Sequence, residues 1–260
     1  MKDLNEYIKE GLFDGVDKLE GKNGLNNNLK FLKKEIIDWI INNTSERVYK
    51  NKLSVDMTTT PPTVDYNGNI DFNTNITSLN NDNMFQWGKV EGKFYCAYCT
   101  SLKSLEGGPK VVGKDFSCSY CLLLKDLKGA PEEVGGVFDC YFCLSLESLE
   151  GCPKEVGSIF NCSYCDKLKS LKGGPEKVGG DFNCYYCNSI TSLEGAPKEV
   201  GGDFGCSDCK SLKTLKGAPK EVAGNFSCRY CESLTSLKGA PRKIGEVFDC
   251  GCCESLTRNK

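Results

Sequence analysis

Residues 179–209, GGDFNCYYCNSITSLEGAPKEVGGDFGCSDC, contain two CxxC pairs with eighteen residues between them. Considered alone, this spacing is typical of a four-cysteine zinc site. The same stretch also repeats itself, because an FxCxxC pattern begins at Phe182 and again at Phe204. Self-similarity has to be weighed before the metal motif, because a structural repeat produces the same cysteine spacing.

The FxCxxC pattern recurs eight times at an unbroken spacing of 22 residues, starting at Phe94, Phe116, Phe138, Phe160, Phe182, Phe204, Phe226 and Phe248. The full unit reads FxCxxCxSLxSLxGxPxxVGxx, and one of its columns is Pro109, Pro131, Pro153, Pro175, Pro197, Pro219 and Pro241. Only Cys152 and Cys252 lie outside the scheme. A fixed period of this length is the signature of a solenoid.

Each unit supplies apolar positions around one coil. Phe and the first Cys alternate with period two, so they point to the same side of a short strand. The second Cys and then Leu212, Leu215 and Val222 continue the apolar set in the sixth unit. The Gly-x-Pro and Val-Gly segments are turn-forming and oppose a helix on the return path. One unit cannot bury its apolar face alone, so eight stacked units are expected to share one core.

This pattern resembles the 22-residue leucine-rich repeat in which cysteine replaces asparagine in LxxLxLxxNxL. In DFGCSDCKSL, Phe204 and Cys206 occupy the two strand leucine positions, Cys209 the Asn/Cys position and Leu212 the following leucine. The resemblance covers about residues 92–257 and implies a curved or gently twisted stack with a parallel sheet on one face. Phe and Cys replace the usual leucines, and the Gly- and Pro-rich return segment favours extended or 3₁₀ turns over a helix. The family is a recognition scaffold, which implies no particular ligand.

The paired cysteines are then expected to form an interior ladder. If FxCxxC stays extended, its two cysteines are about 10 Å apart, too far for both sulfurs to bind one metal. Uniform spacing also opposes zinc, because paired sites would group the repeats two by two. We therefore expect free, buried thiols and no cofactor, with zinc or redox chemistry as the alternative. The ladder comprises Cys96, Cys99, Cys118, Cys121, Cys140, Cys143, Cys162, Cys165, Cys184, Cys187, Cys206, Cys209, Cys228, Cys231, Cys250 and Cys253.

Aromatic residues dominate the second position between the paired cysteines. This column reads Tyr98, Tyr120, Phe142, Tyr164, Tyr186, Asp208, Tyr230 and Cys252. Such a stripe is a candidate interaction face for a protein or a glycan, because Tyr supplies contact area and a hydrogen-bonding tip. The alternative is that the rings shield the sheet edge and stack on their neighbours. The sequence favours the alternative, since Asp208 and Cys252 interrupt the column.

Composition excludes several functions. The 33 basic and 35 acidic residues nearly cancel, so neither nucleic acid nor a membrane surface is an expected partner. No apolar run is long enough to span a membrane, and the first residues carry charges rather than the apolar core of a secretory signal. Without export the thiols stay reduced. Histidine is absent, and neither a phosphate-binding loop nor a nucleophile–base pair is present, so no enzyme is predicted.

The residues before the repeats divide into two parts. Residues 1–27 are expected to form a short amphipathic helix over 1–14 followed by a Gly/Asn-rich linker. Residues 28–91 are expected to cap the stack with a helix over about 28–44, short strands in TVDY and NIDFN, and a degenerate repeat with Ile70 and Phe72 at strand positions. Residues 92–257 carry the eight repeats, and the C-terminal end is thinly capped.

The first eleven residues, MKDLNEYIKEG, resemble the capsid-targeting leader of internal head proteins in tailed bacteriophages. That resemblance implies cleavage by a prohead protease after Ile8-Lys9-Glu10 and before Gly11, so Glu10 and Gly11 form a candidate processing site. It also implies a phage-encoded chain located in the cytoplasm of a bacterial host or in the virion, with capsid components as partners. The alternative is an ordinary surface helix.

The leading interpretation is a non-catalytic repeat scaffold that binds a protein partner. The first alternative is a virion structural or cargo protein delivered to the prohead by its leader. The second is a zinc-binding or redox protein that uses its CxxC pairs. The residue patterns identify neither the partner nor the face that binds it.

Overall fold

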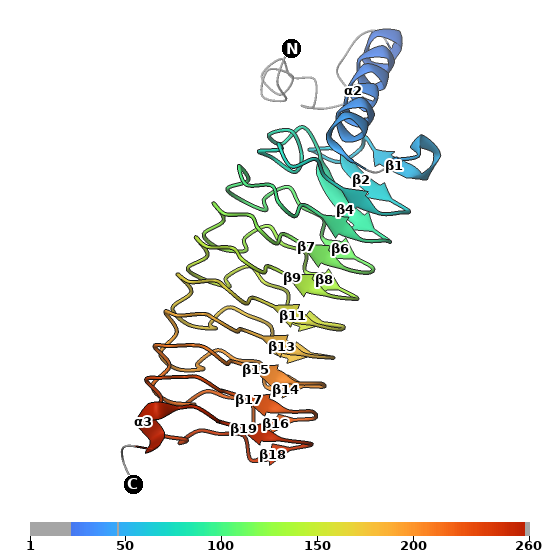
Figure 1. Ribbon diagram of the computed structural model, residues 1–260. Helices are drawn as coiled ribbons and strands as arrows, with labels where there is room; N and C mark the ends of the chain where they lie inside the picture. The colour runs from blue at the N-terminus through green and yellow to red at the C-terminus, as the bar shows by residue number, and fades with distance from the viewer. Residues whose placement is uncertain (1–21, 46, 258–260) are drawn as a thin grey trace.

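The chain forms an elongated solenoid, as the repeat predicts (Figure 1). The computed structural model describes residues 22–45 and 47–257. The expected helix over 1–14 and the candidate processing site at Glu10–Gly11 lie outside these residues.

The eight FxC segments and Ile70–Asp71 form one parallel sheet of nine short strands. Phenylalanine pairs with phenylalanine along it, as Phe160 does with Phe182, which keeps every coil in the same register. Ile70 pairs with Phe94, so Ile70–Asp71 forms the first rung of this sheet. The strands are β3 (Ile70–Asp71), β5 (Phe94–Tyr95), β7 (Phe116–Ser117), β9 (Phe138–Asp139), β11 (Phe160–Asn161), β13 (Phe182–Asn183), β15 (Phe204–Gly205), β17 (Phe226–Ser227) and β19 (Phe248–Asp249).

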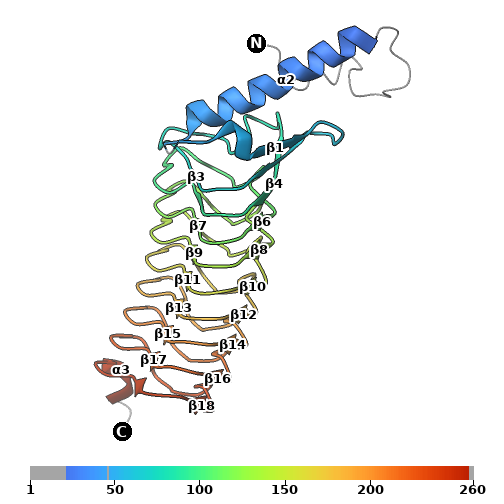
Figure 2. The ribbon, with the colours of Figure 1, turned by 90° about the vertical axis from the view of Figure 1, so that its right-hand side faces the viewer.

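A second sheet of ten strands runs along another side of the stack (Figure 2). One sheet is predicted from the sequence, and the Val-Gly segments are predicted to be turns only. In the structure, the Val and the residue before it pair with their equivalents in neighbouring coils. The other segments of the coil bodies contain turns and no helix, as expected. The strands are β1 (Leu53–Asp56), β2 (Thr63–Tyr66), β4 (Gln86–Val90), β6 (Val111–Val112), β8 (Glu133–Val134), β10 (Glu155–Val156), β12 (Lys177–Val178), β14 (Glu199–Val200), β16 (Glu221–Val222) and β18 (Lys243–Ile244).

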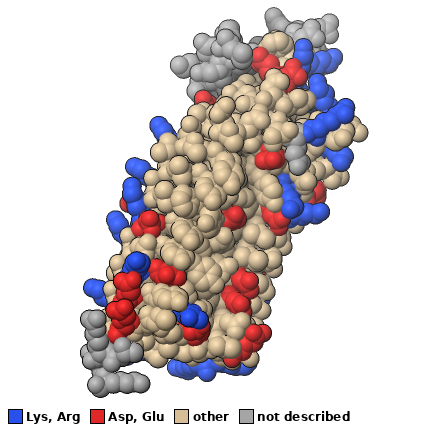
Figure 3. Space-filling view, viewed as in Figure 1, with Lys and Arg blue, Asp and Glu red and all other residues tan. Residues whose placement is uncertain are grey.

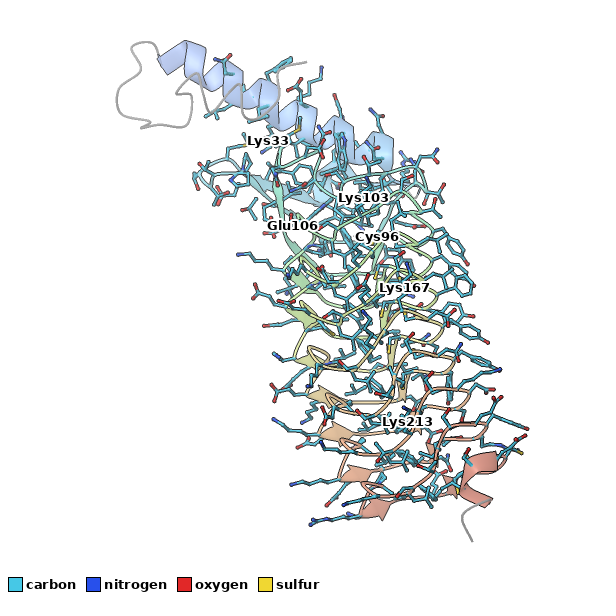
Figure 4. The ribbon with its side chains drawn as sticks, turned by 90° about the vertical axis from the view of Figure 1, so that its left-hand side faces the viewer. Lys33, Cys96, Lys103, Glu106, Lys167 and Lys213 are labelled. Atoms are coloured by element: carbon cyan, nitrogen blue, oxygen red, sulfur yellow. The ribbon has the colours of Figure 1, made fainter. Side chains whose placement is uncertain are left out.

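The core consists of columns of identical side chains. The phenylalanines from Phe94 to Phe248 stack with ring centroids 5.1–5.9 Å apart. Cysteine and leucine columns pack beside them, and Cys96 lies inside the stack (Figure 4). Burial of one equivalent face per coil supplies the apolar contacts that a single coil cannot make alone.

One glycine column has a backbone reason to exist. Gly195 has φ +95°, in the left-handed region, and its six equivalents have φ of +81° to +95°. A Cβ at Gly195 would also collide with the backbone nitrogen of Lys172 in the preceding coil. Both observations explain why the unit carries Gly before Pro.

The N-terminal end is closed by helix α2 (Lys22–Asn43), which lies across the first rungs (Figure 2). The helix begins six residues before the expected start at 28, so it takes in part of the segment read as linker. Ile36 and Ile40 are fully buried, and the Trp39 ring lies 6.1 Å from that of Phe72. A 3₁₀ turn, η1 (Lys50–Lys52), leads into β1, which pairs antiparallel with β2 and ends the parallel sheet.

The C-terminal end carries one short helix, α3 (Glu254–Thr257). Cys252 is exposed at this end, whereas Cys253 is buried. The last rung is therefore thinly covered within the described residues, in agreement with the sequence.

Candidate functional site

Each CxxC segment bends, which corrects the expectation of an extended chain. The two residues between the cysteines form a turn, and the second has φ between 55° and 62° in all eight coils. Polar side chains before the first cysteine hold the bend: Asp139 Oδ1 accepts the N–H of Tyr141 at 3.0 Å, and Asn161 Oδ1 accepts that of Ser163 at 3.1 Å. The argument against zinc from an extended 10 Å separation therefore fails.

The thiols nevertheless serve the interior of the stack. In seven successive coils the second cysteine donates its S–H to the carbonyl oxygen of the first cysteine one coil earlier, at 3.1–3.4 Å, as Cys209 does to Cys184. Fifteen of the sixteen ladder cysteines are buried and Cys250 is half-buried. Burial raises the pKa of the Cys99 thiol to about 12. No cluster of three or more metal-ligating side chains is present in residues 22–45 and 47–257.

The bend presents the aromatic side chains on the surface. We call Tyr98, Tyr120, Phe142, Tyr164, Tyr186 and Tyr230 the aromatic column. The backbone N–H of each of these residues donates to the next coil, as that of Tyr164 does to Tyr185 O at 2.8 Å, so the backbone under the column belongs to the ladder. Tyr98 and Tyr230, at the two ends, are 55% and 45% exposed, and the residues between them are half-buried.

Neighbouring rings of the column stack on one another. The Tyr98 and Tyr120 centroids are 4.5 Å apart and nearly parallel, and those of Tyr164 and Tyr186 are 4.4 Å apart. The Phe142 ring lies between these two pairs and is tilted against both neighbours, with its centroid 5.0 Å from Tyr120 and 6.0 Å from Tyr164. The predicted stacking is therefore present in the Tyr98–Tyr120 and Tyr164–Tyr186 pairs.

Two further tyrosines widen this surface. The Tyr141 ring lies 5.4 Å from that of Tyr120 and 5.2 Å from that of Tyr164. Tyr185 lies over Gly205, where any Cβ would collide with its ring. Gly205 thus replaces the polar residue found at the equivalent position in the other coils because the Tyr185 ring occupies that space.

The column is interrupted at Asp208. The negative charge of Asp208 raises the pKa of the neighbouring Tyr186 hydroxyl. Beyond the interruption, the Arg229 guanidinium lies 5.3 Å from the Tyr230 ring centroid and bonds Asp249 at 3.2 Å. The surface therefore has a continuous aromatic part from Tyr98 to Tyr186 and a separate charged part near the C-terminal end.

An open groove of about 970 Å³ adjoins the N-terminal end of the column. The sequence gives no prediction of this groove, because the C-terminal end of α2, Ser45 and the first coils form it together. Asp71 and Asp115 line it, and each has a partner: Ser45 Oγ lies 2.9 Å from Asp71 Oδ2, and Lys93 Nζ lies 2.9 Å from Asp115 Oδ2. Asp139 also lines it, and burial raises the pKa of its carboxyl group.

Charged residues lie mostly away from the centre of the face that Figure 3 shows. Uncharged residues cover most of the surface in Figure 3, and the Lys, Arg, Asp and Glu side chains lie mainly along its edges and at the C-terminal end. Many pair between coils, as Glu176 does with Lys198 at 2.6 Å and Glu194 with Lys216 at 2.7 Å. Exposed pairs of this kind contribute about 0–1 kcal/mol each, so they are poor candidates for a site.

Comparison with models of known families, with curated proteins and with solved structures gave no match. Among the described helices, none has the length and apolar character needed to cross a membrane.

Proposed function

We propose that the chain is a non-catalytic repeat scaffold that binds a protein partner along the aromatic column. The observation that carries this proposal is the row of five neighbouring rings from Tyr98 to Tyr186, with centroids 4.4–6.0 Å apart and each residue on a left-handed backbone position.

The backbone conformation at these positions is unfavourable for aromatic residues. A left-handed conformation costs a residue with a Cβ about 1–2 kcal/mol, and Gly, Asn and Asp tolerate it best. Asp208 is the one residue of the eight that follows this preference. The aromatic residues do not follow this preference, so stacking of their rings, binding by them, or both must offset the conformational cost.

The orientation of the rings favours a protein over a glycan or a nucleic acid. Sugars and bases are bound against free ring faces. Here neighbouring rings lie 4.4–6.0 Å apart along the column, which leaves no room between them for a sugar or a base. Partly exposed tyrosines are typical of protein contact surfaces, where Tyr adds area at a low cost in side-chain entropy.

Removal of the rings tests the proposal. Tyr120→Asn and Tyr164→Asn keep a residue that accepts the left-handed backbone but lose the aromatic edges. Proteins retained by the immobilised chain from a bacterial lysate are identified by mass spectrometry, and the purified partner is titrated by calorimetry. The double variant should bind at least ~10-fold more weakly than the parent chain.

Two controls separate binding from stability. Asp208→Asn changes the same backbone position without removing a ring, and Lys198→Gln changes the charged edge; both should bind as the parent does. Thermal unfolding of every variant is measured in parallel. If Y120N/Y164N lowers the melting temperature yet binds with parental affinity, the rings serve only the stack and the proposal fails.

The leader resemblance carries a second proposal, that the chain is phage-encoded and packaged in the head. It rests on Ile8-Lys9-Glu10-Gly11 and is independent of the aromatic column. Mass spectrometry of the chain recovered from virions should give an N-terminus at Gly11. An N-terminus at Met1 in that material would contradict processing.

A further inference from the structure

The C-terminal coil exposes residues whose equivalents are core in every inner coil. Leu237 is 38% exposed, whereas Leu193 and Leu215 are fully buried. Ile244 and Phe248 are half-buried, whereas the equivalent Val222 and Phe226 are 1% and 0% exposed. Val247, beside them, is 58% exposed. Within the described residues only α3 covers a part of this end.

The same end presents unpaired backbone groups. In the preceding coil, the N–H groups of Phe226, Cys228 and Tyr230 donate to the last coil at 2.8–3.1 Å. The equivalent N–H groups of Phe248, Cys250 and Cys252 have no acceptor among residues 22–45 and 47–257. Because the N–H and C=O of one residue in a parallel strand point to the same side, this edge offers both donors and acceptors to a further strand.

The other end of the molecule does not offer a matching surface. Helix α2 and the antiparallel β1 close this end, and Ile36 and Ile40 of the helix are fully buried against the stack. Head-to-tail stacking of copies would therefore leave the exposed edge against a capped end. A copy related by a two-fold axis instead sets the C-terminal face of one last coil against the same face of the other, so that the two exposed strand edges can pair with each other.

The charges at this edge are compatible with self-association. The edge carries both signs: Lys243 pairs with Glu221 and Asp249 with Arg229 of the preceding coil, and Arg242 and Glu246 lie beside them in the sequence. A two-fold axis reverses the order of the residues, so it can set basic side chains of one copy against acidic side chains of the other. An edge of a single sign would repel its copy.

We propose that two copies of the chain associate through their C-terminal coils, with the edges of β18 and β19 facing those of the second copy. The dimer is closed, because both exposed edges are consumed and both outer ends are capped by α2. This proposal uses a different surface from the aromatic column and does not depend on it.

The mass of the full chain in solution tests the proposal. Light scattering after size-exclusion chromatography, from low to high micromolar concentration, should give twice the chain mass of 28.6 kDa. Val247→Lys places a charge on an exposed residue of the edge, as does Leu237→Lys at a second point. Each should raise the dissociation constant of the dimer at least ~10-fold.

Leu123→Lys is the matched control, because Leu123 is a 43% exposed leucine in the second repeat, far from the C-terminal edge. This variant should remain dimeric, and circular dichroism confirms that all three variants fold. Hydrogen exchange supplies an independent readout: the amides of residues 248–252 should be protected in the dimer and exchange faster in V247K.

A monomer at every concentration would overturn the proposal, as would a dimer that V247K and L237K leave intact. Protection of residues 248–252 only after addition of a different protein would assign this edge to a foreign strand and would also overturn it.

Discussion

At the residue scale, the two cysteines of the sixth repeat have different surroundings. In the sixth coil Cys206 and Cys209 are both fully buried, but only Cys209 donates to a carbonyl oxygen, that of Cys184 at 3.1 Å. A buried hydroxyl that finds an acceptor costs much less than one that does not. The two positions should therefore respond differently to the same substitution.

We expect Cys206→Ser to lower the free energy of unfolding by about 1–3 kcal/mol, because its hydroxyl is buried without an oxygen acceptor. Cys209→Ser should cost less than half as much, since its hydroxyl can donate to the Cys184 carbonyl. Urea denaturation under reducing conditions measures both values. Equal losses for the two variants would contradict a hydrogen-bonding role for the second cysteine.

Residue types also explain what the sequence cannot predict. The left-handed turn between the cysteines carries Tyr or Phe at six of eight positions, whereas Gly, Asn or Asp would have indicated it. The sequence signal for this turn lies three residues before the left-handed residue. There, the side chains of Asp139, Asn161 and Asp249 accept a backbone N–H and hold the bend. Without that signal, FxCxxC is read as extended.

At the element scale, the strands that carry large residues are the predictable ones. The Phe-x-Cys period and the 22-residue spacing predict the nine-stranded sheet, the buried ladder and the solenoid. The ten-stranded sheet is missed because each coil contributes only two residues, as in β14 (Glu199–Val200), too few for a periodic signal. The start of α2 is missed because Gly24 and the asparagines after it have low helix propensity.

Helix α2 is expected to protect the rungs beneath it. Ile40→Ala removes a fully buried side chain from the cap and should cost about 2–4 kcal/mol. Because coils contact only their neighbours, hydrogen exchange should accelerate in β3 and β5 and stay slow in β13 and β15. Phe31→Ala, at a 53% exposed position on the same helix, serves as the control and should change neither. Uniform acceleration along the whole stack would contradict nearest-neighbour stability.

At the scale of the whole molecule, the buried thiols link stability to alkaline pH. Burial raises the pKa of Cys99 to about 12 and those of Cys162 and Cys206 well above the ordinary 9.0. Above pH 9 the unfolded chain therefore binds fewer protons than the folded chain. The stabilisation is fully present below pH 9 and is lost as the pH rises toward 12.

We expect the free energy of unfolding to fall steeply above pH 9, with each buried thiol contributing a slope of about 1.4 kcal/mol per pH unit. Circular dichroism with urea, in the presence of a reductant and from pH 8 to 11, measures the slope. Replacing Cys162 and Cys206 by Val removes two of the titrating groups and should flatten the curve. A free energy that stays constant to pH 10.5 would show that the thiols are accessible in the folded state.

The unbroken register has a consequence for the length of the molecule. Every coil offers the same backbone groups to its successor, and phenylalanine meets phenylalanine at each junction. Excising one block of 22 residues from the middle, or duplicating it, joins surfaces that already fit and leaves both ends unchanged. The length of the molecule can therefore change by one whole unit at a time, whereas losing or gaining a single residue would break the register of the coil in which it falls.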